Sequence, residues 1–395
     1  MGSDSVRNPP PPGPGTGRRL AVLYHRPFAA AYHGGSIHLR GFVERLSRAV
    51  PVVVVAPQER VGNRTDDSET ADPLMTGFRY LVASSLGAVR FMLRDFLRRP
   101  ADRCRGIVCF DIYLVGIGVF WSRLRGLPFV YYPQDSTTEV TRRWKEAGYR
   151  GGVLFRLTRA PLERIGLANA RIVVVPSGAM QAAFEAEGVP PSRIRICTVK
   201  RSPPVRDPAT IAGWRHRLEL NGRRAVVFIG SFQYSPNVRA FEFLRDAVAP
   251  ELLRTDPELS VVVAGLDSEP YISHRAANLR VLGTVADLDG LLFACSIGVA
   301  PMDVGGGTSG KIVDYVLHGL RVLATPEAAA GIEPTAQVEV APRGDFATRL
   351  VEMARALRDH PVDPDDGCDA EFLRRYTESG DIDALGIELR RMVGL

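Results

Sequence analysis

Short runs of β-branched and apolar residues recur through the first half of this chain, and stretches with helical periodicity, such as Ile37–Ala49 and Gly87–Arg99, separate them. The runs are Leu20–Tyr24, Val52–Ala56, Tyr80–Ser84, Ile107–Phe110, Phe129–Tyr132 and Ile172–Pro176. Runs of this length, bounded by turn residues, are typical of strands that are buried on both faces. Strands that alternate with helices predict a parallel, doubly wound α/β sheet.

The same alternation starts again after a proline-rich stretch that contains Pro203, Pro204 and Pro208. The second series of expected strands is Ala225–Ile229, Ser260–Ala264, Arg280–Leu282, Ile297–Ala300, Arg321–Ala324 and Val338–Ala341. We therefore expect two Rossmann-like domains, residues 19–200 and 201–370, that face each other across a cleft. Residues 371–395 are expected to form a helix that crosses back to the first domain, and residues 1–18, rich in Pro and Gly, a disordered leader.

Charges are divided unevenly along the chain. Residues 1–200 contain 29 Lys+Arg and 16 Asp+Glu, whereas residues 201–395 contain 21 and 28. A basic half joined to an acidic half indicates two domains with different partners, the basic one facing something anionic. Only three of the 50 basic residues are lysines, Lys145, Lys200 and Lys311, so the position of each lysine is informative.

Several classes of protein are disfavoured by the sequence. The cysteines, Cys104, Cys109, Cys197, Cys295 and Cys368, have no metal-ligand spacing, so neither a zinc site nor a disulfide framework is expected. Met1–Gly17 has no apolar core of a secretory signal, and the longest apolar stretch, Ile107–Trp121, is too short to span a bilayer. Gly116 and Gly118 begin a dinucleotide fingerprint, but Trp121 replaces its third glycine, which argues against NAD or FAD. We expect a cytoplasmic protein without a cofactor, with a peripheral position on the inner face of the membrane as the alternative.

Two loops that follow expected strands are candidate anion sites. The first contains Gly34 and Gly35, directly before a helix, where bare backbone N–H groups can bind an anionic oxygen. A turn that needs positive φ angles is the alternative; His33, His38 and Arg40 nearby favour a site, with His38 left unassigned. The second loop, Ala300–Lys311, combines four glycines with Thr308, Ser309 and a lysine at the start of a helix, which suits a diphosphate.

The second loop is close to a P-loop but departs from it. Gly305, Gly310 and Lys311 have nearly the required spacing, but Ile312 stands where Ser or Thr would bind Mg²⁺. This makes an ATPase or kinase a poor interpretation, and a purely structural glycine turn is the remaining alternative.

A third loop follows Phe129–Tyr132 and contains Gln134 and Asp135. A carboxylate and an amide at the carboxyl end of a strand can hold an acceptor hydroxyl or assist proton transfer. Capping of the next helix by Asp135 or Ser136 is an equally good explanation.

Basic and apolar residues are interleaved in the first half of the chain. Arg90, Arg94 and Arg98 are spaced by four residues, and Arg142–Arg164 contains seven basic residues and two glutamates among aromatic and apolar ones. Such a surface suits an anionic lipid or a polyprenyl phosphate, and a solvated arginine-rich surface explains it as well. Nucleic acid is disfavoured because no binding module accompanies the charge.

An ordered series of motifs in the second half resembles the donor-binding domain of GT-B glycosyltransferases of the GT4 type. The motifs are Val226–Asn237, Pro250, Val263–Gly265, Leu282–Val285, Ala300–Pro301, Gly306–Lys311, Val322–Pro326 and Gly331. Gly34 and Gly35 match the amino-terminal pattern of that family, and Leu162–Arg164 with Ala170–Ser177 resembles the end of its first domain.

The resemblance implies a retaining, metal-independent transferase that moves a sugar from a nucleotide-diphosphate donor to a hydroxyl of a small molecule, a glycan or a polyprenyl-linked sugar. Lys311 would neutralise the diphosphate, while Thr284 and Val285 would border the nucleobase. The expected donor-binding residues are Gly34, Gly35, Gly230, Ser231, Thr284, Val285, Asp303, Gly307, Thr308, Ser309, Gly310, Lys311 and Asp314. Those expected for catalysis are Asp135, Gln134 and His33.

Three departures from the family pattern are present. The paired glutamates of the family fall at Gly306 and Asp314, its basic pair falls within Phe232–Asn237, and its first-domain histidine falls near Gln134. Lys311 is then the one obvious cation, unless Arg26, Arg40 or Arg239 turns inward. These departures leave open a non-catalytic relative that binds a sugar nucleotide or a partner, with a nucleotide-sugar epimerase as a more distant alternative.

Overall fold

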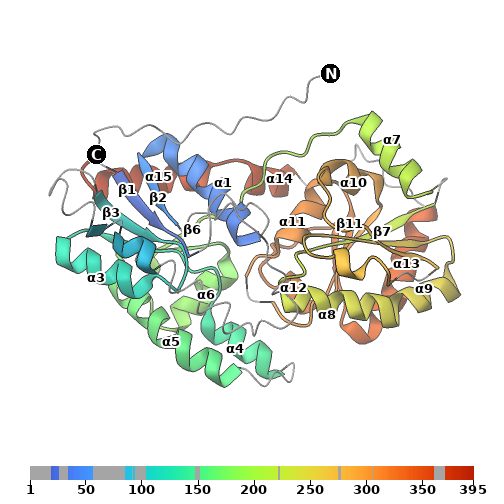
Figure 1. The fold of residues 1–395 in the computed structure, drawn as a ribbon, viewed down its shortest axis with the longest axis horizontal. Helices are drawn as coiled ribbons and strands as arrows, with labels where there is room; N and C mark the ends of the chain where they lie inside the picture. Colours follow the sequence, from blue (N-terminus) through green and yellow to red (C-terminus); the bar gives the residue numbers. More distant parts are fainter. Residues whose placement is uncertain are drawn as a thin grey trace.

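The computed structural model describes residues 19–25, 34–56, 85–90, 92–93, 104–146, 152–220, 223–274, 277–305, 307–359 and 370–395. These residues form two domains, each built on a six-stranded parallel sheet with helices on both faces (Figure 1). The predicted pair of doubly wound α/β domains is confirmed. The leader, His33 and the strand expected at Tyr80–Ser84 lie outside the described residues.

The first sheet has the strand order β2-β1-β3-β4-β5-β6. Its strands are β1 (Arg19–Leu23), β2 (Val52–Val55), β3 (Cys104–Cys109), β4 (Phe129–Tyr131), β5 (Ile172–Val175) and β6 (Ile194–Ile196). The edge strand β6 was not predicted. It has only three residues, a central arginine and an exposed Ile196, so it lacks the continuous apolar run that marks the other strands.

Helices cover both faces of the first sheet. They are α1 (Gly34–Ala49), the helical residues 85–90 and 92–93, α3 (Val115–Arg125), α4 (Thr137–Glu146), α5 (Gly152–Asn169) and α6 (Gly178–Ala186). Side chains of residues 85–93, α3, α5 and α6 share one core cluster on one face of the sheet. Side chains of α1 belong to a second cluster on the other face.

The second sheet has the strand order β12-β11-β10-β7-β8-β9. Its strands are β7 (Ala225–Ile229), β8 (Ser260–Ala264), β9 (Leu279–Val281), β10 (Ile297–Ala300), β11 (Arg321–Ala324) and β12 (Val338–Val340). Every strand expected in this half is present. The inner strands β7, β8, β10 and β11 are short apolar runs that are almost fully buried, whereas the edge strand β12 contains Glu339 and an exposed Val340.

In Figure 1 the helices of the second domain lie in two layers, with α7, α10 and α11 on one side of the sheet and α8, α9 and α13 on the other. Their bounds are α7 (Pro208–Arg217), α8 (Ser235–Phe243), α9 (Ala249–Thr255), α10 (Leu288–Ala294), α11 (Gly310–Leu317), α12 (Pro326–Ala329) and α13 (Phe346–Asp359). A π-helical turn, Leu244–Val248, joins α8 to α9. Pro250 follows that turn, and a proline cannot donate the backbone bond that a regular α-helix would need there.

The C-terminal region consists of two helices rather than one, α14 (Ala370–Thr377) and α15 (Gly380–Met392). Phe372 and Tyr376 of α14 belong to the core of the second domain. Ile382 and Leu385 of α15 belong to the core of the first domain, beside α1. The chain therefore crosses back between Thr377 and Gly380, and the predicted return to the first domain is confirmed.

The strand orders mark where a ligand can enter. In the first sheet the connections diverge between β1 and β3, and in the second sheet between β7 and β10. Loops that follow diverging strands leave a crevice at the carboxyl ends of the strands, where doubly wound folds bind ligands. The loops after these four strands are therefore the first place to look for a site.

Candidate functional site

The loop after β10 leads into α11, whose first residue is Gly310. Ser309 takes the N-cap position, but its side chain makes no capping hydrogen bond within the described structure. The first N–H groups of α11 are therefore available to an outside acceptor, and the helix dipole adds positive potential at the same point. Thr308 is held by its hydroxyl, which donates to the carbonyl oxygen of Gly331 at 3.2 Å.

Glycines in this loop serve close packing rather than a turn with positive φ. None of the described Gly305, Gly307 and Gly310 has a φ angle in the positive range. A Cβ atom would instead overlap the carbonyl oxygen of Glu327 at Gly305, lie 2.9 Å from the carbonyl oxygen of Gln134 at Gly307, and overlap the guanidinium of Arg201 at Gly310. Neighbouring groups thus occupy the space that a side chain would need.

Lys311 lies in the first turn of α11 with its ammonium group turned inward. Its Nζ donates to Oδ1 of Asn237 at 2.7 Å, contacts the sulfur of Met302 at 3.4 Å, and lies 4.2 Å from the centroid of the Phe228 ring. Burial lowers the pKa of Lys311 to about 7, while the Asn237 oxygen and the aromatic face favour the charged form. An anionic ligand at the α11 terminus would restore full protonation.

Gly230 and Ser231 follow β7 and lie beside Lys311, because both contact Asn237. A Cβ on Gly230 would come within 2.8 Å of the Asn237 carboxamide, and Nδ2 of Asn237 donates to the carbonyl oxygen of Ser231 at 2.8 Å. The buried Oγ of Ser231 has no hydrogen-bond partner among the described residues. The structure thus brings these two predicted residues together with Lys311, and it adds Asn237, which the sequence did not single out.

Arg201, from the segment between the domains, is a second cation at this point. Its Nε donates to Oδ1 of Asp314 at 2.6 Å, and both side chains are largely buried. Asp314 is predicted to bind ribose, and in this structure it accepts the hydrogen bond from Arg201. Together with the close approach to Gly310, this contact places a guanidinium at the N-terminus of α11.

Asp303, another predicted donor residue, is also engaged by cations. Nε of Arg239 donates to Oδ2 of Asp303 at 2.7 Å, Nη2 of Arg239 donates to Oδ1 at 3.1 Å, and Nη1 of Arg343 lies 3.8 Å from Oδ2. Bidentate pairing of this kind fixes both partners. Asp303 thus orients Arg239, the inward-turning arginine that the sequence left open.

Gln134 and Asp135 meet the glycine-rich loop from the first domain. The carbonyl oxygen of Gln134 and Oδ1 of Asp135 lie within 2.9 and 3.1 Å of where a Cβ of Gly307 would stand. Nε2 of Gln134 is buried without a hydrogen-bond partner in the described part of the chain. Burial raises the pKa of Asp135, against the opposing charges of Arg159 and Arg143.

Tyr234 directly precedes α8, and the residue is 51% exposed. Its pKa is raised by burial and by the carboxylates of Asp135 and Asp303. Asp135 belongs to the first domain and Asp303 to the second, so Tyr234 lies near a carboxylate of each domain.

Gly34 and Gly35 open α1, whereas His33 lies outside the described residues. His38, one turn further, is buried and pairs through Nε2 with the hydroxyl of Tyr132 at 2.8 Å. Burial, followed by the charge of Arg201, lowers the pKa of His38 to about 3, against a hydrogen bond with Gln134. His38 is therefore a neutral ring that connects α1 to the loop after β4.

A buried His25–Asp111 pair lies just beyond the carboxyl ends of β1 and β3. Nδ1 of His25 and Oδ2 of Asp111 are 2.5 Å apart, and the backbone N–H of His25 also donates to Oδ2 of Asp111. Oδ1 of Asp111 accepts the N–H of Tyr113 at 2.8 Å, and the Tyr113 and His25 rings are 4.6 Å apart. The sequence does not single out this pair, although His25 and Asp111 each directly follow an expected strand.

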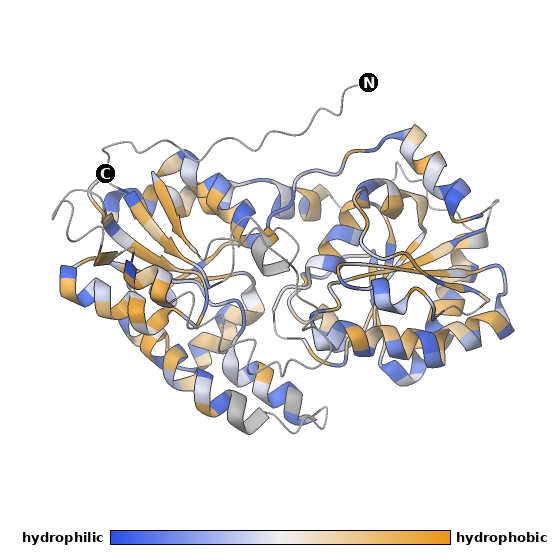
Figure 2. Ribbon diagram, in the orientation of Figure 1, coloured by the Kyte–Doolittle hydropathy of each residue, from blue (hydrophilic) through white to orange (hydrophobic). Residues whose placement is uncertain are grey.

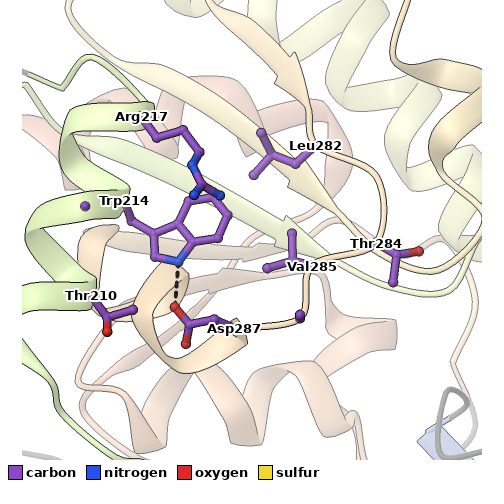
Figure 3. A pocket seen from close by; sticks show the side chains of 9 residues that line it. Thr210, Trp214, Arg217, Leu282, Thr284, Val285 and Asp287 are labelled. Carbon is purple, nitrogen blue, oxygen red and sulfur yellow. Dashed lines mark hydrogen bonds between the residues drawn. The ribbon is translucent and has the colours of Figure 1, made fainter. Parts of the chain in front are cut away.

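Thr284 and Val285 line a surface pocket of about 410 Å³ between α7 and the loop after β9 (Figure 3). Trp214 and Arg217 of α7 form the opposite wall, and Nε1 of Trp214 donates to Oδ2 of Asp287 at 2.7 Å. The backbone N–H of Thr284 donates to Glu269 at 2.9 Å. Neither Lys311 nor Arg201 lines this pocket. Thr284 and Val285 therefore lie in a different place from the cation cluster that Lys311 and Arg201 form at the N-terminus of α11.

Comparisons with known proteins identify both domains. Residues 33–200 match the model of the glycosyl transferase 4-like domain, and residues 223–359 match that of the glycosyl transferases group 1. No curated protein sequence matches the chain.

Solved structures with the same architecture are numerous. Anabaena HepE in complex with UDP-glucose is similar with a TM-score of 0.65 at 14% identity, over 95% of this chain and 99% of that chain. Sucrose-phosphate synthase from Thermosynechococcus elongatus has a TM-score of 0.70 at 14% identity with the same coverage. WaaG, a glycosyltransferase involved in lipopolysaccharide biosynthesis, has a TM-score of 0.58 at 17% identity, also with that coverage.

Proposed function

We propose that this chain, which belongs to the GT4-like glycosyltransferases with the GT-B fold, transfers its sugar with retention of anomeric configuration and without a metal ion. The donor is a nucleotide-diphosphate sugar, and the similarity to a UDP-glucose complex makes UDP-glucose the first donor to test. The acceptor is a hydroxyl of a small molecule, a glycan or a polyprenyl-linked sugar. The proposal also assigns His33 to catalysis and Gly34 and Gly35 to donor binding.

The observation that carries the proposal is the group of cations at the N-terminus of α11. Lys311, the guanidinium of Arg201 and the first N–H groups of the helix gather at one point, at the carboxyl ends of β7 and β10. A leaving diphosphate develops negative charge there, and fixed positive groups that meet this charge lower the barrier. Because the chain itself supplies the cations, the proposal needs no bound metal.

In the proposed reaction the bond between the anomeric carbon and the diphosphate oxygen breaks, and its electron pair leaves with the diphosphate. The acceptor oxygen forms the new bond on the same face of the sugar, and its proton passes to the departing phosphate oxygen. Gln134 and Asp135 approach the loop from the acceptor side, so the unpartnered Nε2 of Gln134 is placed to bind a sugar or acceptor hydroxyl.

Donor turnover tests the proposal directly. The chain is incubated with a panel that begins with UDP-glucose, with and without EDTA, and nucleotide release is followed with candidate acceptors. We expect release that EDTA leaves unchanged and a product whose anomeric coupling constant in NMR equals that of the donor. Inversion, or loss of turnover with EDTA, contradicts the proposed mechanism. Lys311→Met is the inactive control and Leu253→Ser, on the exposed side of α9, the active one.

A further inference from the structure

Three helical segments on one face of the first domain carry apolar side chains on their outer as well as their inner sides. The inner sides, with residues such as Ala88, Val119 and Leu167, share one core cluster. The exposed apolar side chains are Leu86, Val89 and Leu93 of segment 85–93, Phe120 and Leu124 of α3, and Leu157 and Ile165 of α5. We call this set, with the arginines described next, the outer face. A water-exposed helix ordinarily places polar residues there.

Two of the three segments, α3 and α5, lie side by side. Gly116, near the start of α3, is closest to Leu162 of α5, and Nε of Arg123, near the end of α3, donates to Oδ1 of Asn169 at the end of α5. The two helices therefore run parallel and in contact. Figure 2 shows apolar colouring on both of them. Phe120 and Leu124 are 65% and 59% exposed, so the patch is a surface and not part of the core.

Charge on the outer face has a single sign. Arg90, Arg123, Arg156 and Arg164 are exposed, and the one carboxylate on the described residues of these three segments, Glu163, is buried and accepts the N–H of Thr137. Other parts of the expected basic surface are engaged elsewhere. Arg142 pairs with Glu139, and Nη1 of Arg143 donates to the carbonyl oxygen of Gly305 at 2.6 Å.

We propose that the outer face is the surface by which this protein docks on a lipid bilayer that carries anionic headgroups. Leucine and phenylalanine side chains enter the boundary between headgroups and acyl chains, and arginines flank them to meet the headgroup charge. A soluble protein partner would present individual carboxylates at separate positions. A bilayer presents a uniform anionic plane, which suits arginines on three segments that have no exposed carboxylate among their described residues. No helix in the described part of the chain has the length and hydropathy to cross a membrane.

Docking there would place the acceptor side of the cleft near the bilayer. Leu157 of the outer face is two residues from Arg159, whose charge acts on Asp135. The proposal rests on the exposed side chains alone and does not depend on the donor chemistry, so its failure leaves the transferase proposal untouched.

Co-sedimentation of the full chain with vesicles of phosphatidylcholine, with and without phosphatidylglycerol, tests the proposal. We expect binding only to the anionic vesicles, weakened by salt, because each arginine near such a surface contributes about fivefold. Phe120→Ser with Leu124→Ser should lower the binding constant by roughly tenfold or more. Arg156→Gln with Arg164→Gln, which removes two of the four exposed arginines, should lower the salt dependence by about half.

Leu253→Ser with Ile387→Ser, two exposed apolar residues outside the outer face, is the matched control and should bind as the parent chain does. Circular dichroism melts and donor hydrolysis show whether each variant is folded. Equal binding of the Phe120/Leu124 variant, or no preference for anionic vesicles, overturns the proposal. Light scattering gives the third outcome: a dimer that the same variant abolishes, without vesicle binding, assigns the face to self-association and also overturns it.

Discussion

Lys311→Met is the substitution that tests the candidate site most sharply. It keeps an unbranched side chain against Phe228 and Met302 but removes the charge and the hydrogen bond to Asn237. A hydrogen bond from a charged donor contributes about 1.5–3 kcal/mol, which corresponds to roughly 10- to 150-fold in the dissociation constant. We therefore expect UDP to bind Lys311→Met at least tenfold more weakly than the parent chain, as measured by isothermal titration calorimetry.

The pH dependence of UDP binding separates a lost charge from a lost shape. The pKa of Lys311 in the free protein is lowered to about 7, and a bound diphosphate raises it, so binding above that pH takes up a proton. The dissociation constant of the parent should rise by up to about tenfold per pH unit as pH increases above 7. The terminal phosphate of UDP ionises near pH 6 and stays fully charged in this window. Lys311→Met should show no such slope.

Glu163 is the internal control, because burial raises its pKa to about 7 as well. Glu163→Gln should retain the pH slope of UDP binding, since its carboxylate contacts the N–H of Thr137 and not the cation cluster. Heats measured in buffers of different ionisation enthalpy report the proton uptake directly. A slope that persists in Lys311→Met, or parent binding that is independent of pH, would refute the assignment of Lys311 to the diphosphate.

The lowered pKa of Lys311 also predicts that Lys311→Met, which weakens UDP binding, makes the folded protein more stable. The pKa of Lys311 is lower in the folded than in the unfolded state, so between the two values the unfolded chain binds more protons, and the contribution of Lys311 to stability rises with pH. Its cost is fully present below pH 7 and disappears above the ordinary value near 10.5. Lys311→Met should therefore raise the free energy of unfolding at pH 6, by an amount that shrinks toward pH 10. Urea titrations at the two pH values measure the difference.

Three further predictions concern the surroundings of the site. If the Arg201 guanidinium faces the diphosphate, Arg201→Ala should weaken the binding of UDP by roughly tenfold and the binding of uridine by less than about twofold. Equal losses of affinity for the two ligands in calorimetry would assign Arg201 to the ribose side, through its partner Asp314. Gly307→Ala forces the loop away from Gln134, so turnover should fall by roughly tenfold or more with little change in the melting temperature; unchanged kinetics would show that the contact is unimportant. Lys200→Met leaves the Asp381 carboxylate without its cation at 2.9 Å and should cost about 3–5 kcal/mol in urea unfolding, far more than loss of the exposed Arg254–Glu251 pair.

The sequence predicts the fold well because the two sheets are parallel. Strands buried on both faces need continuous apolar runs, and these are visible without any tertiary information. The strand β6 is not predicted because it is a short edge strand without a continuous apolar run. The division into α14 and α15 is not predicted because both segments have helical composition. What separates these two helices is their destination: Phe372 packs in one domain and Ile382 in the other.

The candidate site is predictable only where one loop contains it. Lys311 and its glycines are neighbours in sequence, so their chemistry can be read locally. Arg201 and Asp314 are 113 residues apart, His25 and Asp111 are 86 apart, and Lys311 and Asn237 are 74 apart. Pairs of this kind depend on strand order and on the contact between the domains. Arg201 is one of many arginines in the chain, and nothing in its local sequence distinguishes it.

The contacts of the glycine-rich loop couple donor binding to the position of the domains. Two groups of the first domain contact this loop: Nη1 of Arg143 donates to the Gly305 carbonyl, and the Gln134 carbonyl lies against Gly307. The Arg201 guanidinium, from the segment that joins the domains, lies against Gly310. A glutamate at position 307 would bring its carboxylate against the Gln134 carbonyl. Glycine there removes that repulsion and lets the first domain close directly on the loop. If this loop binds the donor diphosphate as proposed, separating the domains would remove groups that shape it. We therefore expect closure of the two domains to contribute to donor affinity as well as to the exclusion of water.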